Sequence, residues 1–219
     1  MENKNWLLVI ILGILWGSSF LFVEILLNFI NPFMIVYLRV SIASMILIFY
    51  LLLIKIEIQF SNKLISNLFI MGLLNNVFPF LLITAGQQYI TGGLASILNA
   101  NTSFMTILIA SLFIKNEKLL RSRLIGVTIG LIGVIITIGY ENLLGIFSTE
   151  IGKFFIIISS VSYAFAAIFA KIKLNELDPS FAATGMLTTS TIILTPIMFF
   201  YYSDEIYNLS FVSIKYSVA

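Results

Sequence analysis

The stretch from Gly92 to Glu117, GGLASILNANTSFMTILIASLFIKNE, is long enough to cross a bilayer and carries one polar face. Numbered as a helix, its small and polar residues recur at three-, four- and seven-residue steps, so they share that face. This seam comprises Gly92, Ser96, Asn99, Ser103, Thr106, Ala110 and Glu117. Hydrocarbon does not accept such a seam, so we expect it to face other helices or a wet cavity.

The composition of the whole chain predicts an integral membrane protein. Of its 219 residues, 60% are hydrophobic and 10% charged, whereas a soluble domain carries roughly a quarter charged residues. The net charge of +2 is spread over many loops and gives no sign of nucleic-acid binding. Cysteine and histidine are both missing, which excludes thiolate and imidazole catalysis and most transition-metal ligation. We therefore expect no cofactor, no metal site and no enzymatic activity.

Apolar stretches of about 20 residues predict an all-α, polytopic membrane helix bundle with about seven spans. The spans cover roughly 6–27, 33–54, 64–84, 92–114, 121–139, 151–171 and 180–201. The first apolar run reaches Leu27 without a cleavage site, so it is interpreted as a retained span and not a signal peptide. Nine Lys and Arg residues fall on the side of the N-terminus and two on the other. This bias predicts a multi-pass inner (plasma) membrane protein with a cytoplasmic N-terminus.

A weak repeat appears when the chain is shifted by 147 positions. Asn28 and Pro32 then align with Asn175 and Pro179, and Trp16 aligns with Tyr163. The copies are separated by an odd number of spans, so the second copy would run through the membrane upside down. We predict a five-span inverted repeat, with 1–140 as the first copy and 151–219 as an incomplete second copy of two spans and the start of a third. Inverted repeats are typical of secondary transporters, whose sites lie near midplane.

Several motifs resemble those of a known family. They are Trp16-Gly17-Ser18-Ser19-Phe20, Pro32 with Arg39, the Ala95-to-Glu117 run, the glycines Gly126, Gly130 and Gly133, and Ser162-Tyr163-Ala164. With these motifs the whole chain resembles the EamA-type branch of the drug/metabolite transporter superfamily. The resemblance implies two inverted five-span repeats that move small metabolites. Two departures are evident: Ser103 stands where the family usually has a helix-breaking proline, and spans eight to ten are missing.

The candidate substrate-binding residues are polar or aromatic side chains inside apolar spans. They are Trp16, Ser19, Arg39, Asn75, Asn76, Ser96, Asn99, Ser103 and Tyr163. Arg39 would favour a carboxylate-bearing ligand, and Trp16 and Tyr163 could flank it. Ordinary helix packing explains the hydroxyl groups and the aromatic residues equally well.

Three further features add to these candidates: a charged pair near the outer boundary, a proline near the midplane of the third span, and the turn that follows this span. Glu24 and Arg39 could pair as a gate across a short turn, or extend separately to the headgroups. Pro79 is expected to free the carbonyl of Asn75 and break or kink the third span. Gln87, Gln88 and Tyr89, beyond that span, are expected in a solvated turn.

We predict a transporter of small metabolites, amino-acid-like or otherwise amphiphilic, that works by alternating access in the lipid bilayer. One alternative is a non-transporting truncated remnant, or a fragment, of a ten-span carrier. A membrane-embedded lipid-headgroup enzyme is less consistent with scattered acids and the lack of histidine. Gly126 and Gly130 predict close helix packing, either within the bundle or in a homodimer.

Overall fold

The computed structural model describes residues 3–55, 61–114 and 150–202, together with isolated positions between 122 and 136. The helices are α1 (Asn3–Leu26), α2 (Pro32–Ile54), α3 (Asn62–Gly72), the π-helical turn η1 (Leu73–Val77), α4 (Phe78–Gly86), α5 (Gly92–Asn99), α6 (Asn101–Phe113), α9 (Glu150–Lys173) and α10 (Pro179–Tyr201). In this part of the chain, six helical stretches are long and apolar enough to cross a membrane. The prediction of an all-α membrane bundle is confirmed, while the predicted span 121–139 lies mostly outside the described residues.

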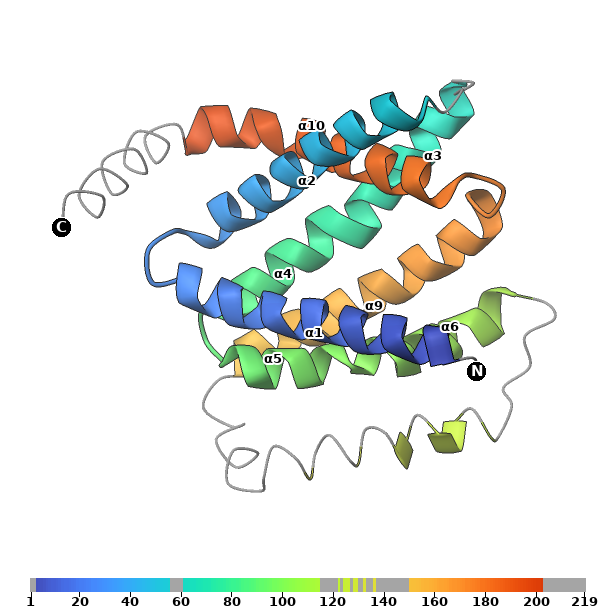
Figure 1. The fold of residues 1–219 in the computed structure, drawn as a ribbon. Helices are drawn as coiled ribbons and strands as arrows, with labels where there is room; N and C mark the ends of the chain where they lie inside the picture. Colours follow the sequence, from blue (N-terminus) through green and yellow to red (C-terminus); the bar gives the residue numbers. More distant parts are fainter. Residues whose placement is uncertain are drawn as a thin grey trace.

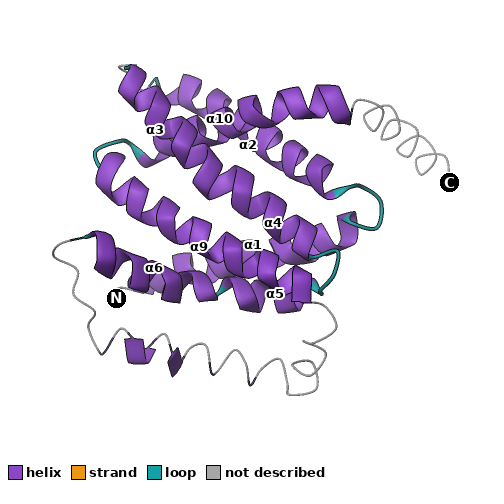
Figure 2. Ribbon diagram, turned by 180° about the vertical axis from the view of Figure 1, so that it is seen from behind, coloured by secondary structure: helices purple, strands orange, loops and turns teal. Residues whose placement is uncertain are grey.

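The helices form an upper and a lower group joined by α4 and α9 (Figure 1). Helix α10 packs against α2 and α3, and α4 packs along α9. Below them, α5 contacts both α1 and α9, and α6 contacts α9. The same arrangement is seen from behind in Figure 2. The helix that carries the polar seam therefore packs against α9, the first helix of the predicted second copy.

The two helix pairs at either end of the chain have matching boundaries. Helices α9 and α10 each begin and end 147 residues after α1 and α2. Figure 1 shows α9 running opposite to α1, and α10 opposite to α2. Asn31 and Asp178 occupy the same place, just before a helix that begins with proline: Asn31 accepts one backbone N–H bond and Asp178 accepts two. A capping side chain followed by proline is a strong helix start, so both pairs turn at equivalent positions.

The third crossing is one continuous helical stretch with a π-helical turn just before Pro79, and the carbonyl that this proline releases differs from the expected one. In η1 the N–H of Phe78 donates to the carbonyl of Leu73, five residues back. The next bond of this pattern would join Pro79 to Leu74, and proline has no N–H to donate. The hydroxyl of Ser162 on α9 donates to the Leu74 carbonyl instead, at 2.7 Å. The π turn thus moves the released carbonyl from Asn75 to Leu74, and α9 provides its partner.

This bond leads to a first prediction. Ser162→Ala would leave the Leu74 carbonyl without its partner and destabilise the bundle by about 1–3 kcal/mol, the cost of an unpaired buried polar group. The measurement is the unfolding midpoint in mixed detergent micelles. Ser18→Ala serves as the control, because the exposed Ser18 hydroxyl bonds only to the Leu15 carbonyl of its own helix. Equal midpoints for Ser162→Ala and the wild type would contradict the assigned role.

Candidate functional site

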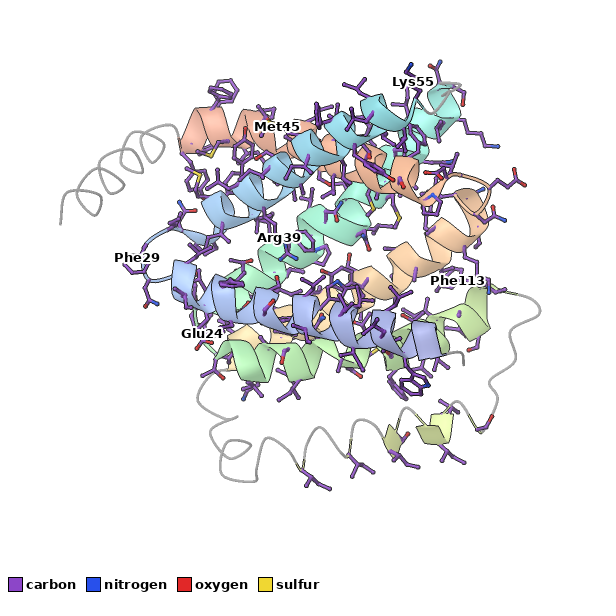
Figure 3. The ribbon with its side chains drawn as sticks, in the orientation of Figure 1. Glu24, Phe29, Arg39, Met45, Lys55 and Phe113 are labelled. Carbon is purple, nitrogen blue, oxygen red and sulfur yellow. The ribbon has the colours of Figure 1, made fainter. Side chains whose placement is uncertain are left out.

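Arg39 is the charged residue that lies deepest among the described helices. It is the eighth residue of α2, about 10 Å along the axis from Pro32. Its guanidinium carbon lies 4.2 Å from the centre of the Phe80 ring on α4, a cation–π contact. It also interacts electrostatically with Tyr163 on α9. Figure 3 shows Arg39 between the labelled ends of the bundle, and its side chain is exposed, so an exposed cation lies where three helices interact.

The contacts of Arg39 return less free energy than placing an arginine in a membrane span costs. An arginine at the centre of a membrane helix costs about 2.5–3.5 kcal/mol by insertion scales, and Arg39 lies about a third of the way along α2. A cation–π contact returns about 0.5–2 kcal/mol. Within the described residues the guanidinium has no carboxylate partner and donates no hydrogen bond. Water, a lipid headgroup or an anion that occupies the site would supply the remaining stabilisation.

Tyr163 connects the Arg39 site to the core beneath it. Its ring packs against the buried cluster of Ile83, Ile90, Ala95 and Ile156. Ala95 on α5 is fully buried in that cluster, and Gly92, three residues earlier, is buried too. The inward face of α5 therefore includes Ala95, which the predicted seam did not contain.

The polar residues of the seam have different surroundings. Ser96 donates to the Gly93 carbonyl at 2.8 Å, and Thr106 donates to that of Thr102 at 2.7 Å, so both hydroxyls are satisfied within their own helix. Ser103 is exposed. Asn99 differs, because its side-chain oxygen is buried and accepts no hydrogen bond from the described residues. Of the seam residues, Asn99 has the clearest need for a ligand or a water.

The crossing that carries Asn99 is interrupted directly after it. Helix α5 ends at Asn99, and α6 begins at Asn101. The N–H of Ala100 between them donates to the carbonyls of both Ser96 and Ile97 at 3.1 Å. The helix is thus tightened here without the proline that the resemblance would place at Ser103.

The two asparagines of the third crossing point toward α10. Asn76 is 2% exposed, and its amide donates to the Ser190 hydroxyl at 3.1 Å. Ser190 in turn donates to the carbonyls of Gly72 and Met186. Asn75 lies 3.4 Å from the Met186 sulfur. Both amides thus contribute to the α10 interface, and Asn76 is satisfied there.

Glu24 and Arg39 have different partners in this structure. A Glu24 carboxylate oxygen accepts the N–H of Gly92 at 3.0 Å, at the start of α5, where the positive end of the helix dipole favours an anion. Figure 3 places Glu24 at one end of the bundle and Arg39 further inside. Their predicted pairing is not made here, so the role of this pair as a gate stays a prediction.

Gln88 and Tyr89 are exposed in a turn as predicted, but Gln87 lies beside this junction and is 6% exposed, so its prediction as a solvated residue was wrong. Its amide donates to the Phe20 carbonyl at 2.9 Å, and its side-chain oxygen is buried with no partner among the described residues. Gly92 allows the close approach, because a Cβ there would lie 2.8 Å from both Glu24 and the Phe20 carbonyl. No pattern in the sequence singled out Gln87, since its burial depends on how α1 crosses the start of α5.

The two aromatic residues related by the 147-residue shift have unlike environments. Trp16 is 66% exposed, whereas Tyr163 is half-buried next to Arg39. Ser19 is half-buried on α1. The structure thus brings Tyr163 and Arg39 together and leaves Trp16 on an open face. Phe80, which completes the Arg39 site, was missed, although it directly follows the helix-breaking Pro79.

Comparison with known proteins adds to this geometry. Residues 4–139 match the EamA-like transporter family. An uncharacterized transporter of Archaeoglobus fulgidus is 22% identical, over 89% of this chain and 67% of the relative. The uncharacterized transporter YoaV of Bacillus subtilis is 24% identical, over 80% and 60%. The uncharacterized inner membrane transporter YedA of Escherichia coli K12 is 30% identical, over 72% and 50%. The chain thus spans between half and two thirds of the length of these relatives.

Proposed function

The chain belongs to the EamA-like transporter family, and from this premise we propose that it carries small amphiphilic metabolites of amino-acid-like size across the inner membrane. Transport would occur by alternating access, with the α1–α2 half and the α9–α10 half moving against each other. The observation that carries the proposal is the pair of oppositely directed helix hairpins with boundaries 147 residues apart. Inverted repeats allow the same contacts to form on either side of a central site.

The proposed substrate site lies among α2, α4, α5 and α9. Arg39 and Tyr163 are the members with the strongest support, because they interact with each other. The buried side-chain oxygen of Asn99 provides a hydrogen-bond acceptor. Trp16, Ser19, Ser96 and Ser103 lie on helices beside it and would contact substrate in another conformation of the cycle. Asn75 and Asn76 would act through the α10 interface, where the two halves meet.

The proposed orientation places the N-terminus in the cytoplasm. Lys55 and Lys63 lie where α2 ends and α3 begins, and Lys171 lies near the end of α9. Figure 3 shows Lys55 at the end of the bundle opposite Glu24 and Phe29. The positive-inside rule supports a cytoplasmic position for this lysine-rich end.

Transport in proteoliposomes tests the proposal. Purified protein is reconstituted, and initial rates of uptake are measured for radiolabelled amino acids and aromatic acids. At least one solute is expected to enter faster than it enters empty liposomes. Rates equal to those of empty liposomes for every solute would overturn the proposal.

An amide variant locates the site within this assay. Asn99→Ala is expected to lower the transport rate about tenfold, since one lost hydrogen bond of about 1.4 kcal/mol is a factor of ten. Asn28→Ala is the matched control, because its exposed amide bonds only to the Glu24 and Ile25 carbonyls. Unchanged transport in Asn99→Ala would remove Asn99 from the site.

A further inference from the structure

The flat face of the Arg39 guanidinium contacts an aromatic ring, whereas the N–H donors along its edge have no partner among the described residues. One face is occupied by the Phe80 ring at 4.2 Å. Along its edge the guanidinium has five N–H donors in a planar fork. None of them is used within the described residues, and the side chain is exposed. A planar fork held flat on an aromatic ring is suited to bind a carboxylate through two parallel hydrogen bonds.

Among the described residues, no acidic side chain lies beside this fork to offset its positive charge. The described acidic side chains lie away from Arg39: Glu24 accepts the N–H of Gly92 at the start of α5, and Glu176 and Asp178 lie in the turn before α10. The groups that do interact with Arg39 are the Phe80 ring, at 4.2 Å, and Tyr163, through an electrostatic interaction. An ammonium group in this site would therefore face a fixed positive charge without a carboxylate among the described residues to offset it.

We infer that the Arg39 site selects a net-negative carboxylate with an apolar or aromatic body over the corresponding zwitterion or neutral amide. The carboxylate would lie against the edge of the guanidinium, and the apolar body would lie beside Phe80 and Tyr163. This inference rests on the proposed carrier function and narrows its substrate class from amino-acid-like solutes in general to organic anions.

Three probes of one size separate the possibilities. They are 3-phenylpropionate, L-phenylalanine, which adds only an ammonium group, and 3-phenylpropanamide, which removes the charge. Binding is measured on the purified chain in dodecyl maltoside, from the concentration dependence of the thermal unfolding midpoint. We expect 3-phenylpropionate to bind at least about tenfold more tightly than the other two. Equal or tighter binding of phenylalanine or of the amide would overturn the inference.

Variants test whether Arg39 is responsible. Arg39→Gln is expected to weaken binding of 3-phenylpropionate by about tenfold to a hundredfold, as for a lost charge-assisted pair. Arg39→Lys should give an intermediate loss, since it keeps the charge without the planar fork. Lys63→Gln is the matched control, because it removes one positive charge at an exposed helix end. If Arg39→Gln does not fold, Arg39→Lys and Phe80→Leu carry the test. Wild-type affinity in the Arg39 variants would overturn the assignment.

The same chemistry is present in an anionic lipid headgroup, so one arm uses phosphatidylglycerol. If this lipid stabilises the wild type through Arg39 and abolishes the effect of 3-phenylpropionate, the occupant is a lipid and the solute version is overturned. Binding and transport can also fail separately. Specific binding without flux in proteoliposomes would overturn the carrier and retain the anion site. Flux that Arg39→Gln leaves unchanged for every solute would overturn the anion site and retain the carrier.

Discussion

Gly152→Leu is expected to abolish the folded bundle, because Gly152 and Gly86 are where α9 and α4 touch. A Cβ at Gly152 would lie 2.8 Å from the Gly86 carbonyl oxygen and 2.9 Å from the Tyr89 Cβ. A Cβ at Gly86 would in turn lie 2.9 Å from the Gly152 carbonyl oxygen. These close contacts involve backbone atoms, which cannot turn aside as a flexible side chain can. Small residues at such a crossing let two helices approach closely, and leucine would force them apart.

The expected loss exceeds the roughly 1–3 kcal/mol of ordinary core overpacking, because α9 also contacts α5 and α6. Against a total stability of about 5–15 kcal/mol, the variant should yield little monodisperse protein. The measurement is the monodisperse fraction in size-exclusion chromatography of a fluorescent fusion. Gly13→Leu is the control, since a Cβ at Gly13 would meet nothing within 4 Å. A Gly152→Leu protein that behaves like the control would show that α4 and α9 do not cross at this point.

The second large effect is expected for Asn76→Asp, which changes one amide nitrogen to oxygen at almost constant shape. Asn76 is 2% exposed and donates to the Ser190 hydroxyl. That hydroxyl lies within hydrogen-bonding distance of the Gly72 and Met186 carbonyls. An ionised aspartate would place a negative charge among these acceptor oxygens. A neutral aspartate would have to keep a proton that it loses in water at neutral pH. Either outcome costs several kcal/mol in a buried apolar site.

The measurement for Asn76→Asp is the unfolding midpoint in mixed micelles, with Asn28→Asp as an exposed control. The result also distinguishes two roles of Asn76. If the variant keeps wild-type stability and loses only transport, Asn76 faces water and substrate, as the sequence-based assignment has it. If stability falls sharply, Asn76 primarily joins the third crossing to α10.

Residues close together in the sequence were sufficient to predict most helix ends and one irregularity inside a helix. Apolar length predicted starts near residues 33 and 180, one residue from the starts of α2 and α10, where the structure shows Asn31 and Asp178 as caps before proline. Pro79 likewise predicts a disturbance in its own helix. The position of Ser103 was less informative, because the fourth crossing is interrupted at Ala100 through backbone bonds that need no proline.

The candidate site could be predicted only in part. Arg39 and Tyr163 were found from their residue type inside apolar spans, and they lie close enough to interact. Phe80 was missed and Gln87 was assigned to a solvated turn, since an aromatic ring or an amide near a span end has many ordinary explanations. The seam predicted from helical periodicity includes Asn99, but it leaves out Ala95, the fully buried residue of α5.

By itself, the sequence determined that this chain is a bundle of membrane helices and where those helices begin, because span length, caps and prolines act over a few residues. The tertiary structure alone decided which groups meet. Ser162 reaches the Leu74 carbonyl and Asn76 reaches Ser190 across 88 and 114 residues, and Arg39 lies over Phe80 on another helix. Such contacts depend on how each helix is rotated and crossed, and many rotations satisfy the same apolar pattern.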